Sequence, residues 1–210
     1  MARYQATRLD KGNELLIYFR VHWSQVHESR RKFLVLMILA LLSAASVSSH
    51  RLAACFPNTV LGASNQKRIE RFFGSYVLDY QAVARLIVKM LGETGRLKLV
   101  LDRTDWMLGS TSIDISTLAV VCRGSTAIPL MFRLLPHQGN SSQAVRIEFI
   151  QQFIQTFGED QIEWLTADRE FIGKEWLRFL KENNIPFYIR IKQNQYLTDK
   201  NGKKQQPCFL

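Results

Sequence analysis

The spacing of hydrophobic positions changes near residue 95. Before that point, apolar residues recur at helical intervals over residues 15–26, 33–47 and 79–91. After it, short runs alternate apolar and polar residues with a period of two, which is typical of strands. The sequence therefore predicts an all-helical N-terminal domain over residues 1–95, followed by a mixed α/β domain.

The most apolar run, residues 33–47 (FLVLMILALLSAASV), follows the basic residues Arg30, Arg31 and Lys32. It is shorter than the roughly 18 residues that a membrane span needs, and it begins too far from the N-terminus for a usual signal peptide. We therefore expect a buried helix of the helical domain and no membrane partner. A protein anchored in a membrane by this run is the alternative.

A shorter helix with basic and aromatic residues is expected next, with Ser64 as its N-cap and Gly74 at its end. It carries Lys67, Arg68 and Arg71 beside apolar residues, so one face suits packing and the other suits phosphate groups. An ordinary surface helix has the same pattern, and both interpretations stay open.

The second part of the chain twice places an aspartate after an apolar strand. Leu97, Leu99 and Leu101 alternate with other residues and lead to Asp102, and residues 162–167 lead to Asp168. The pattern also predicts strands at 115–122, 126–135 and 185–192, a turn at 107–110, a helix from Ser141 or Ser142 to Gly158, and a helix at 173–184. The order is β-β-β-α-β-α-β, which is the arrangement of an α/β ribonuclease-H-like mixed sheet.

Topology is expected to bring the two aspartates together. Right-handed crossovers place the fourth strand parallel to the first and next to it, so both strands would finish at the same edge of the sheet. Two bare carboxylates repel each other, and a Mg²⁺ or Mn²⁺ ion between them removes the conflict. Two such ions about 3.5–4 Å apart support phosphodiester cleavage in many enzymes. Asp102 and Asp168 are therefore candidate metal ligands and catalytic residues.

Composition narrows the class of partner. The net charge of +10 over 210 residues favours a polyanion, either nucleic acid or an anionic membrane surface, over an uncharged partner. Solvated surface charge with no partner is the alternative. Three separated cysteines and four histidines without ligand spacing indicate neither a zinc site nor a disulfide framework, and they fit a reducing cytoplasm.

Several short motifs follow one another between residues 96 and 194. They are Leu101-Asp-Arg-Thr-Asp-Trp with Gly109, Pro129-Leu, Gly139-Asn-Ser, Ala167-Asp-Arg-Glu-Phe-Ile-Gly with Trp176, and Phe187-Tyr-Ile-Arg-Ile-Lys with Asn194. Together they resemble the DDE transposases of the insertion-sequence-four family. The resemblance implies that Asp102 and Asp168 are the first two members of a catalytic acidic triad. They would bind Mg²⁺ while the enzyme nicks the ends of its element and joins them to target DNA.

The resemblance also implies partners and a location. The helical region 1–95 resembles the part of that family that binds the ends of the element. The residues expected to contact nucleic acid are Lys67, Arg68, Arg71, Arg103, Arg169, Arg190 and Lys192. The expected partner is double-stranded DNA, as transposon ends and as target, with a homodimer on DNA as an option. The expected location is the cytoplasm, in association with the nucleoid.

The third acid of the triad is missing from this pattern. The family supplies a glutamate within the pattern Tyr, two residues, Arg, three residues, Glu, six residues, Lys, which does not occur here. Residues 96–193 would then form an incomplete catalytic core, and residues 194–210 the start of a β-rich insertion whose first hairpin turns at Asn201-Gly202. We expect a truncated and inactive copy, frameshifted or interrupted. The alternatives are a compact nuclease that uses Glu170 or Asp105 as the third acid, and a non-catalytic DNA-binding fragment with a regulatory role.

Overall fold

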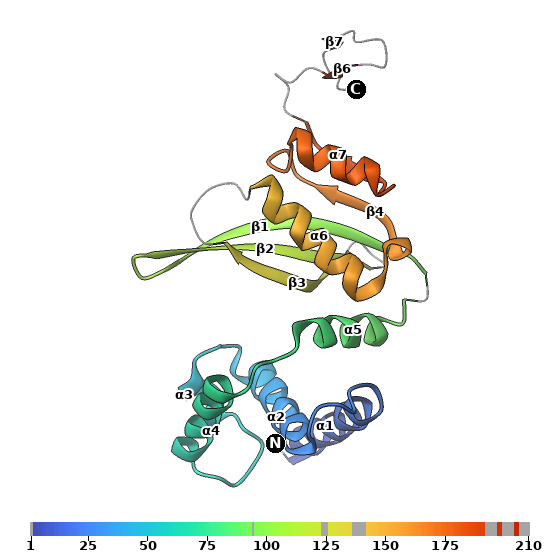
Figure 1. Cartoon of the computed structure of the whole chain (residues 1–210). Coiled ribbons are helices and arrows are strands. Elements are labelled where there is room, and N and C mark those ends of the chain that lie inside the picture. The colour runs from blue at the N-terminus through green and yellow to red at the C-terminus, as the bar shows by residue number, and fades with distance from the viewer. Residues whose placement is uncertain are drawn as a thin grey trace. The chain divides into compact units, whose positions relative to one another are not determined.

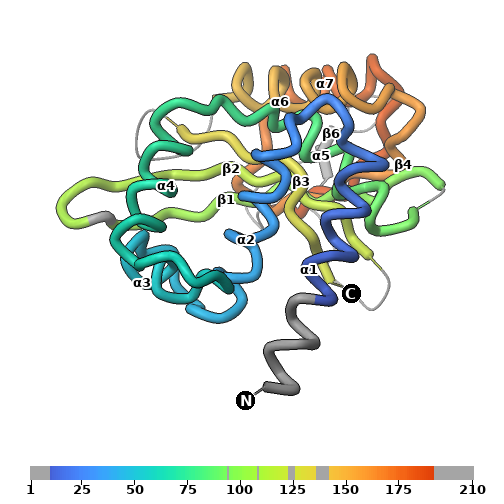
Figure 2. Tube along the Cα trace, turned by 90° about the horizontal axis from the view of Figure 1, so that it is seen from below, coloured from blue at the N-terminus to red at the C-terminus, as the bar shows by residue number. Residues whose placement is uncertain are grey.

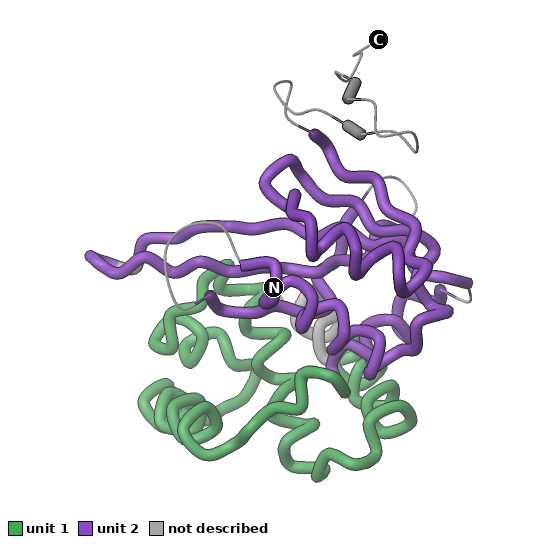
Figure 3. The backbone as a smooth tube through the Cα atoms, turned by 45° about the horizontal axis from the view of Figure 1, so that its top comes forward, with its two compact units in different colours: residues 1–82 green, residues 83–210 purple. Residues whose placement is uncertain are grey.

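The chain forms two compact units in a computed structural model, which describes residues 2–93, 95–122, 126–135, 142–191, 197–198 and 204–205 (Figure 1). The first unit is Met1–Ala82 and the second is Val83–Leu210 (Figure 3).

The first unit is helical, as the spacing of apolar residues predicts. Its helices are α1 (Ala2–His22), α2 (Glu28–Ala44), α3 (Ser49–Ala54) and α4 (Gly62–Ser75). The apolar run becomes α2, in which Phe33, Met37 and Ala40 are buried against α3 and α4, so the expected buried helix is confirmed. Among the helices of the described residues, none has the length and apolar character that a membrane span requires.

The predicted ends of α4 are wrong. The helix begins at Gly62, and its preceding residue Leu61 makes no side-chain capping bond. The carbonyl oxygen of Leu61 already accepts hydrogen bonds from the backbone N–H groups of Ser64 and Asn65, at 2.9 and 3.1 Å, so Ser64 lies inside the first turn and is not the N-cap. The helix also continues through Gly74 to Ser75.

The second unit is built on a five-stranded mixed sheet with the strand order β3-β2-β1-β4-β5. Its elements are α5 (Tyr80–Leu91), the first turn of which belongs to the first unit, β1 (Leu97–Leu108), β2 (Thr111–Val121), β3 (Ala127–Leu135), α6 (Gln143–Phe157), the short 3₁₀ helix η1 (Glu159–Gln161), β4 (Ile162–Ala167), α7 (Lys174–Glu182), β5 (Phe187–Ile189), β6 (Leu197–Thr198) and β7 (Lys204–Gln205). Strands β1 to β3 form an antiparallel meander, whereas β4 and β5 run parallel to β1. Helices α6 and α7 lie side by side on the sheet (Figures 1 and 2). The predicted ribonuclease-H-like mixed fold is confirmed.

Apolar residues at alternate positions of the strands form the core of this unit. Leu97, Leu99 and Leu101 of β1 are almost fully buried, while the residues between them are directed to the other face of the sheet. The buried residues of α6 and α7 that join this core are Phe149, Ile150, Phe153, Trp176 and Leu180.

The predicted end of α6 at Gly158 is confirmed, and of the two candidate N-caps the structure has Ser142. Ser142 is the N-cap, and its hydroxyl accepts a hydrogen bond from the backbone N–H of Val145 at 3.3 Å. Gly158 ends the helix with a φ of 96°, in the left-handed region that favours glycine. The expected hairpin near the C-terminus is present as the antiparallel pair β6–β7, while the predicted turn Asn201-Gly202 lies outside the described residues.

Three strand boundaries differ from the prediction. Strand β1 does not stop at Asp102 but continues to Leu108, because β2 pairs with it as far as the pair Leu108–Thr111. Strand β2 accordingly starts four residues earlier than predicted, and the end of this hairpin projects beyond the rest of the sheet (Figure 1). Strand β5 covers only Phe187–Ile189, because it pairs with β4 over three residues.

The boundary between the two units lies at Ala82 rather than at residue 95. Helix α5 accounts for the difference. Its residue Ala84 is buried in the core of the sheet, and Ile87, Val88 and Leu91 pack against that core. A helical sequence pattern alone did not indicate which core the helix would join.

Candidate active site

The register of the parallel strands brings the two predicted aspartates next to each other. Strand β1 pairs with β4 up to the pair Leu101–Ala167. Asp102 is the next residue of β1, and Asp168 directly follows the end of β4. Neighbouring strands lie about 4.8 Å apart, so carboxylates at these two positions can reach a common ion. Both residues are exposed to solvent.

Each aspartate is positioned by its own element. Asp102 stays within β1, and its Oδ1 accepts a hydrogen bond from the backbone N–H of Arg103 at 2.8 Å. Asp168 follows the end of β4, where its carbonyl oxygen accepts a hydrogen bond from the backbone N–H of Phe171 at 2.9 Å and so forms a turn. The backbone of Asp168 is therefore held between the end of β4 and a hydrogen-bonded turn.

A hollow of about 580 Å³ adjoins the second aspartate. It is lined by Asp168, Arg169, Ile189, Arg190 and Ile191. The backbone N–H of Arg190 donates to the carbonyl oxygen of Ala167 at 3.3 Å, which fixes the chain after β5 beside the end of β4. Two of the predicted DNA contacts, Arg169 and Arg190, thus flank a predicted metal ligand.

The donor set suits a hard divalent cation. Mg²⁺ and Mn²⁺ prefer oxygen ligands, and Mg²⁺ commonly takes one or two protein carboxylates together with phosphate oxygens. Asp102 and Asp168 offer two such carboxylates in exposed positions. Within the described part of the chain, no group of three or more His, Cys, Asp or Glu side chains is arranged to hold a metal.

Arg103 is directed away from solvent, toward two other carboxylates. Its guanidinium lies 3.2 Å from Glu170 (Nη2 to Oε2) and 3.6 Å from Asp114 (Nη1 to Oδ2). The side chain of Asp114 is only 2% exposed, and that of Arg103 is 20% exposed. The hydrogen bond with Glu170, together with the nearby charges of Glu170, Asp114 and Asp105, raises the pKa of Arg103 above its usual value. Arg103 on β1 therefore links Glu170, in the loop after Asp168, to Asp114 on β2.

Arg146 also holds this loop in place, a role that was not predicted from the sequence. The residue is 4% exposed, and it donates hydrogen bonds to the carbonyl oxygens of Glu170 at 3.2 Å and Ile172 at 3.4 Å. Its guanidinium also lies 5.0 Å from the centre of the Phe171 ring. Burial lowers the pKa of Arg146. Its helical spacing from the buried residue Phe149 is the signal that could have shown it to face the core.

Four other residues were predicted to contact DNA. Lys67, Arg68 and Arg71 lie on α4 in the first unit. Lys192 lies outside the described residues.

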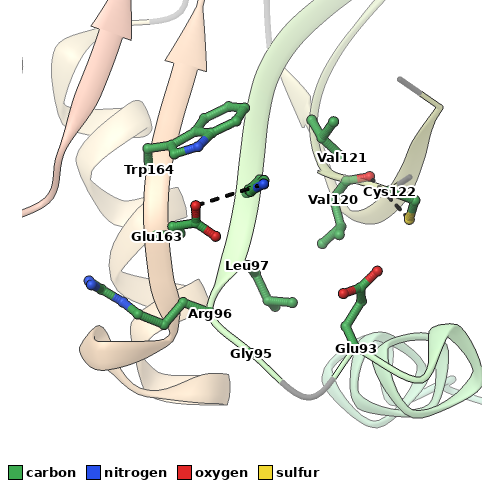
Figure 4. A pocket seen from close by; sticks show the side chains of 10 residues that line it. Glu93, Gly95, Arg96, Leu97, Val120, Val121, Cys122, Glu163 and Trp164 are labelled. Atoms are coloured by element: carbon green, nitrogen blue, oxygen red, sulfur yellow. Dashed lines mark hydrogen bonds and ion pairs between the residues drawn. The ribbon is translucent and has the colours of Figure 1, made fainter. Parts of the chain in front are cut away.

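A second hollow of the sheet unit lies at the opposite end of β1 and β4 (Figure 4). It measures about 490 Å³ and contains the ion pair between Lys98 Nζ and Glu163 Oε1, at 3.8 Å. Trp164 and Glu93 also line it. Because β1 runs from Leu97 at this hollow toward Asp102, the second hollow does not include the aspartate pair.

A comparison with known protein families identifies the family of this chain. The family model of the transposase DDE domain matches residues 93–208, more than half of the 210 residues. The chain belongs to the DDE transposases. The matched region contains both aspartates of this transposase and all five strands of its main sheet. No curated protein matches the chain. Transposase chemistry is DNA chemistry, so the family accounts for a basic protein with a ribonuclease-H-like sheet.

Proposed function

We propose that Asp102 and Asp168 are the first two acids of the catalytic site of a transposase of the insertion-sequence-four type, which moves an insertion sequence by a cut-and-paste route. The observation that carries this proposal is the β1–β4 register, which ends at Leu101–Ala167 and so leaves the two aspartates as neighbours. The motifs around them, with the Asp-Arg-Glu-Phe-Ile-Gly stretch at 168–173, support the assignment to this group.

The two carboxylates would hold Mg²⁺ or Mn²⁺ near the scissile phosphate. A bound divalent ion supplies Lewis-acid stabilisation of the charge that develops in phosphodiester cleavage. Asp102 and Asp168 would hold this ion from well-defined backbone positions, because one lies within a strand and the other in a hydrogen-bonded turn. Arg169 and Arg190, which flank Asp168, are placed to bind the phosphates of the DNA strand at the same site.

The two local candidates for a third acid are poorly suited to join the pair. Glu170 is held by Arg103 through two hydrogen bonds, at 3.2 and 3.3 Å. Asp105 is three residues beyond Asp102 in the same strand, so its side chain is directed to the other face of the sheet. These features favour a site with two of its three acids over a compact nuclease with a local third acid. We accordingly propose that the 210-residue polypeptide, assayed alone, does not complete strand transfer.

Double-stranded DNA is the proposed partner, both as element ends and as target. The helical region ahead of the sheet, with Lys67, Arg68 and Arg71 on α4, is proposed to bind the element ends. A homodimer on DNA is the proposed assembly, because two ends must be joined in one reaction. A regulatory fragment that only binds DNA is the second candidate function. Substituting the two aspartates by asparagine, as described below, distinguishes the two functions.

The first prediction concerns metal binding by the aspartate pair. The substitutions Asp102→Asn and Asp168→Asn should each weaken Mn²⁺ binding at least about tenfold. Even the loss of a residue that merely orients a metal ligand typically lowers metal affinity by about 10–100-fold. Electron paramagnetic resonance of free Mn²⁺ measures this directly and needs no catalysis. Asp105→Asn, in the same strand but on the other face, is the matched control and should bind Mn²⁺ as the unaltered protein does.

Two outcomes would contradict the proposal. Equal Mn²⁺ affinity in all four proteins would remove Asp102 and Asp168 from the metal site. Strand transfer between element ends and a target plasmid by the 210-residue polypeptide would overturn the proposed inactivity. If regulation alone is the function, inhibition of transposition in cells should persist in both Asn variants.

A further inference from the structure

A small basic pocket lies within the helical unit, between α2 and α4. Its volume is about 220 Å³. The residues that line it are Ser29, Arg30, Phe33, Arg68, Arg71, Phe72, Ser75 and Tyr76. Three arginines from two helices therefore converge on one site, although Arg30 is far from the other two in sequence.

Two of these arginines are oriented by aromatic rings. The guanidinium carbon of Arg30 lies 4.3 Å from the centre of the Tyr76 ring, and that of Arg68 lies 5.3 Å from the centre of the Phe33 ring. Phe33 is buried and packs against Phe72, with ring centres 4.9 Å apart, so this platform belongs to the core of the unit. A guanidinium that lies on a ring keeps its N–H edges available for an anion. The rings thus position the arginines without satisfying their hydrogen-bond donors.

The carboxylates near the pocket are engaged elsewhere. Glu28, at the start of α2, pairs with Arg20, Arg31 and Lys32. Glu70 of α4 accepts a hydrogen bond from Gln66 at 3.0 Å. Among the described residues of this unit, no carboxylate forms an ion pair with the three arginines of the pocket. Their positive charges repel one another, and an anion bound between them would remove that cost.

We propose that the pocket binds a phosphodiester group of the DNA backbone, with Arg30, Arg68 and Arg71 as its ligands. Arginine suits this role because its planar fork matches phosphate oxygens in pairs. Arg30 and Arg71 are exposed, so a phosphate that belongs to a long polymer can reach them. The aromatic faces are covered by guanidinium groups, which favours a backbone phosphate over a stacked base. This inference rests on the proposed DNA partner and adds Arg30, which was not among the residues expected to contact nucleic acid.

Salt titration of DNA binding tests the proposal. The full chain is titrated against a short fluorescent duplex, and fluorescence anisotropy measures the affinity across a range of salt concentrations. Each phosphate contact that is lost should reduce the log–log salt slope by about 0.9. Arg30→Ala and Arg71→Ala should each remove such a contact and weaken binding at low salt. Arg30→Lys keeps the charge but not the fork, so it should retain the slope while lowering the affinity.

A neighbouring lysine provides the matched control. Lys32 is also an exposed cation on α2, but it pairs with Glu28 at 3.8 Å and does not line the pocket. Lys32→Ala should leave the salt slope unchanged. Circular dichroism of each variant verifies that the helical unit is folded, which is expected because the substituted side chains of Arg30 and Arg71 are exposed.

The results separate failure of this inference from failure of the proposed function. If the unaltered chain binds duplex DNA with a steep slope and the Arg30 and Arg71 variants match Lys32→Ala, the pocket proposal is overturned and the DNA partner stands. If the unaltered chain binds no duplex at any salt concentration, the DNA partner itself is overturned. If inorganic phosphate binds the unaltered chain in a calorimeter and Arg30→Ala abolishes it while DNA slopes stay equal, the pocket serves free phosphate instead, which also overturns the proposal.

Discussion

Residues Asp102 and Arg103 are adjacent in the sequence but have opposite environments. Because successive side chains of a strand point to opposite faces, Asp102 is exposed while Arg103 reaches Asp114 and Glu170. Arg103, beside a candidate catalytic aspartate, was expected to contact DNA, and in the folded chain it is engaged with two carboxylates. The charge of a residue is evident from the sequence, whereas the partner that neutralises it depends on which strands are neighbours.

At this scale we predict that Arg103 stabilises the fold through Asp114. Arg103→Ala should lower the free energy of unfolding by about 3 kcal/mol, because it leaves a buried carboxylate without its cation. Glu170→Ala should cost about 1 kcal/mol or less, since that partner is partly solvated. The double variant Arg103→Ala with Asp114→Asn should recover most of the loss. Urea unfolding measures all of them.

An exposed ion pair of the same chemistry serves as the control for Arg103. Arg133 and Glu148 lie 2.7 Å apart, with side chains 37% and 58% exposed. Arg133→Ala should cost well under 1 kcal/mol. If Arg103→Ala costs no more than Arg133→Ala, the buried pair has no special role in stability.

At the scale of elements, helix α7 depends on a side chain from α6. The backbone N–H of Trp176, in the first turn of α7, donates to Oε1 of Gln143 at 3.1 Å. Gly173, which ends the Asp-Arg-Glu-Phe-Ile-Gly motif, leaves room for this contact, because a Cβ there would lie 2.1 Å from the same oxygen. A side chain at position 173 would therefore have to displace the flexible carboxamide of Gln143, whereas the backbone conformation of Gly173 is one that any residue adopts.

We predict that Gly173→Ala displaces Gln143 and lowers the free energy of unfolding by about 1–2 kcal/mol, the range for losing a helix cap. Gln143→Ala should cost about 1 kcal/mol, in line with one lost hydrogen bond. Thermal unfolding of the double variant should show less than the sum of the two losses, because the clash and the bond share one side chain. A fully additive result would contradict this account.

Gly74 supplies the comparison for Gly173. It lies within α4 and a Cβ there would meet nothing within 4 Å. Gly74→Ala should be neutral or stabilise the chain by up to about 1 kcal/mol, because alanine restricts the unfolded chain and favours the helix.

At the scale of the whole molecule, the division into two units falls in the first turn of α5 and leaves the rest of this helix, from Val83, with the sheet. Asp79 caps this helix by accepting a hydrogen bond from the backbone N–H of Ala82 at 3.0 Å. The apolar side of the helix then covers part of the sheet core with Ile87, Val88 and Leu91. The sheet unit consequently needs a helix that precedes its first strand.

A pair of fragments tests this assignment. A fragment of residues 79–210 should unfold cooperatively, whereas one of residues 96–210 should be less stable by roughly 3–5 kcal/mol, since it loses three apolar side chains that are partly buried. Near-ultraviolet circular dichroism and thermal unfolding distinguish the two. Equal stability of the fragments would show that α5 contributes nothing to the core of the sheet.

The amino-acid sequence by itself determined the periodic features of this protein. The alternation of apolar residues indicated the strands, the helical spacing indicated α2 and α6, and Ser142 and Gly158 marked the ends of α6. Element order and the handedness of crossovers were enough to predict the mixed sheet and the adjacency of its first and fourth strands. These features depend on local geometry and chain connectivity, which a sequence contains.

Only the tertiary structure decided the partners of individual side chains. It extended β1 past Asp102, because pairing with β2 continues beyond the apolar pattern. It directed Arg103 to Asp114, and it brought Arg30 of α2 beside the arginines of α4. A pattern of residues specifies which face of an element is buried, but the groups that meet there belong to other elements. Their contacts depend on register and packing, and both are fixed only when the whole chain folds.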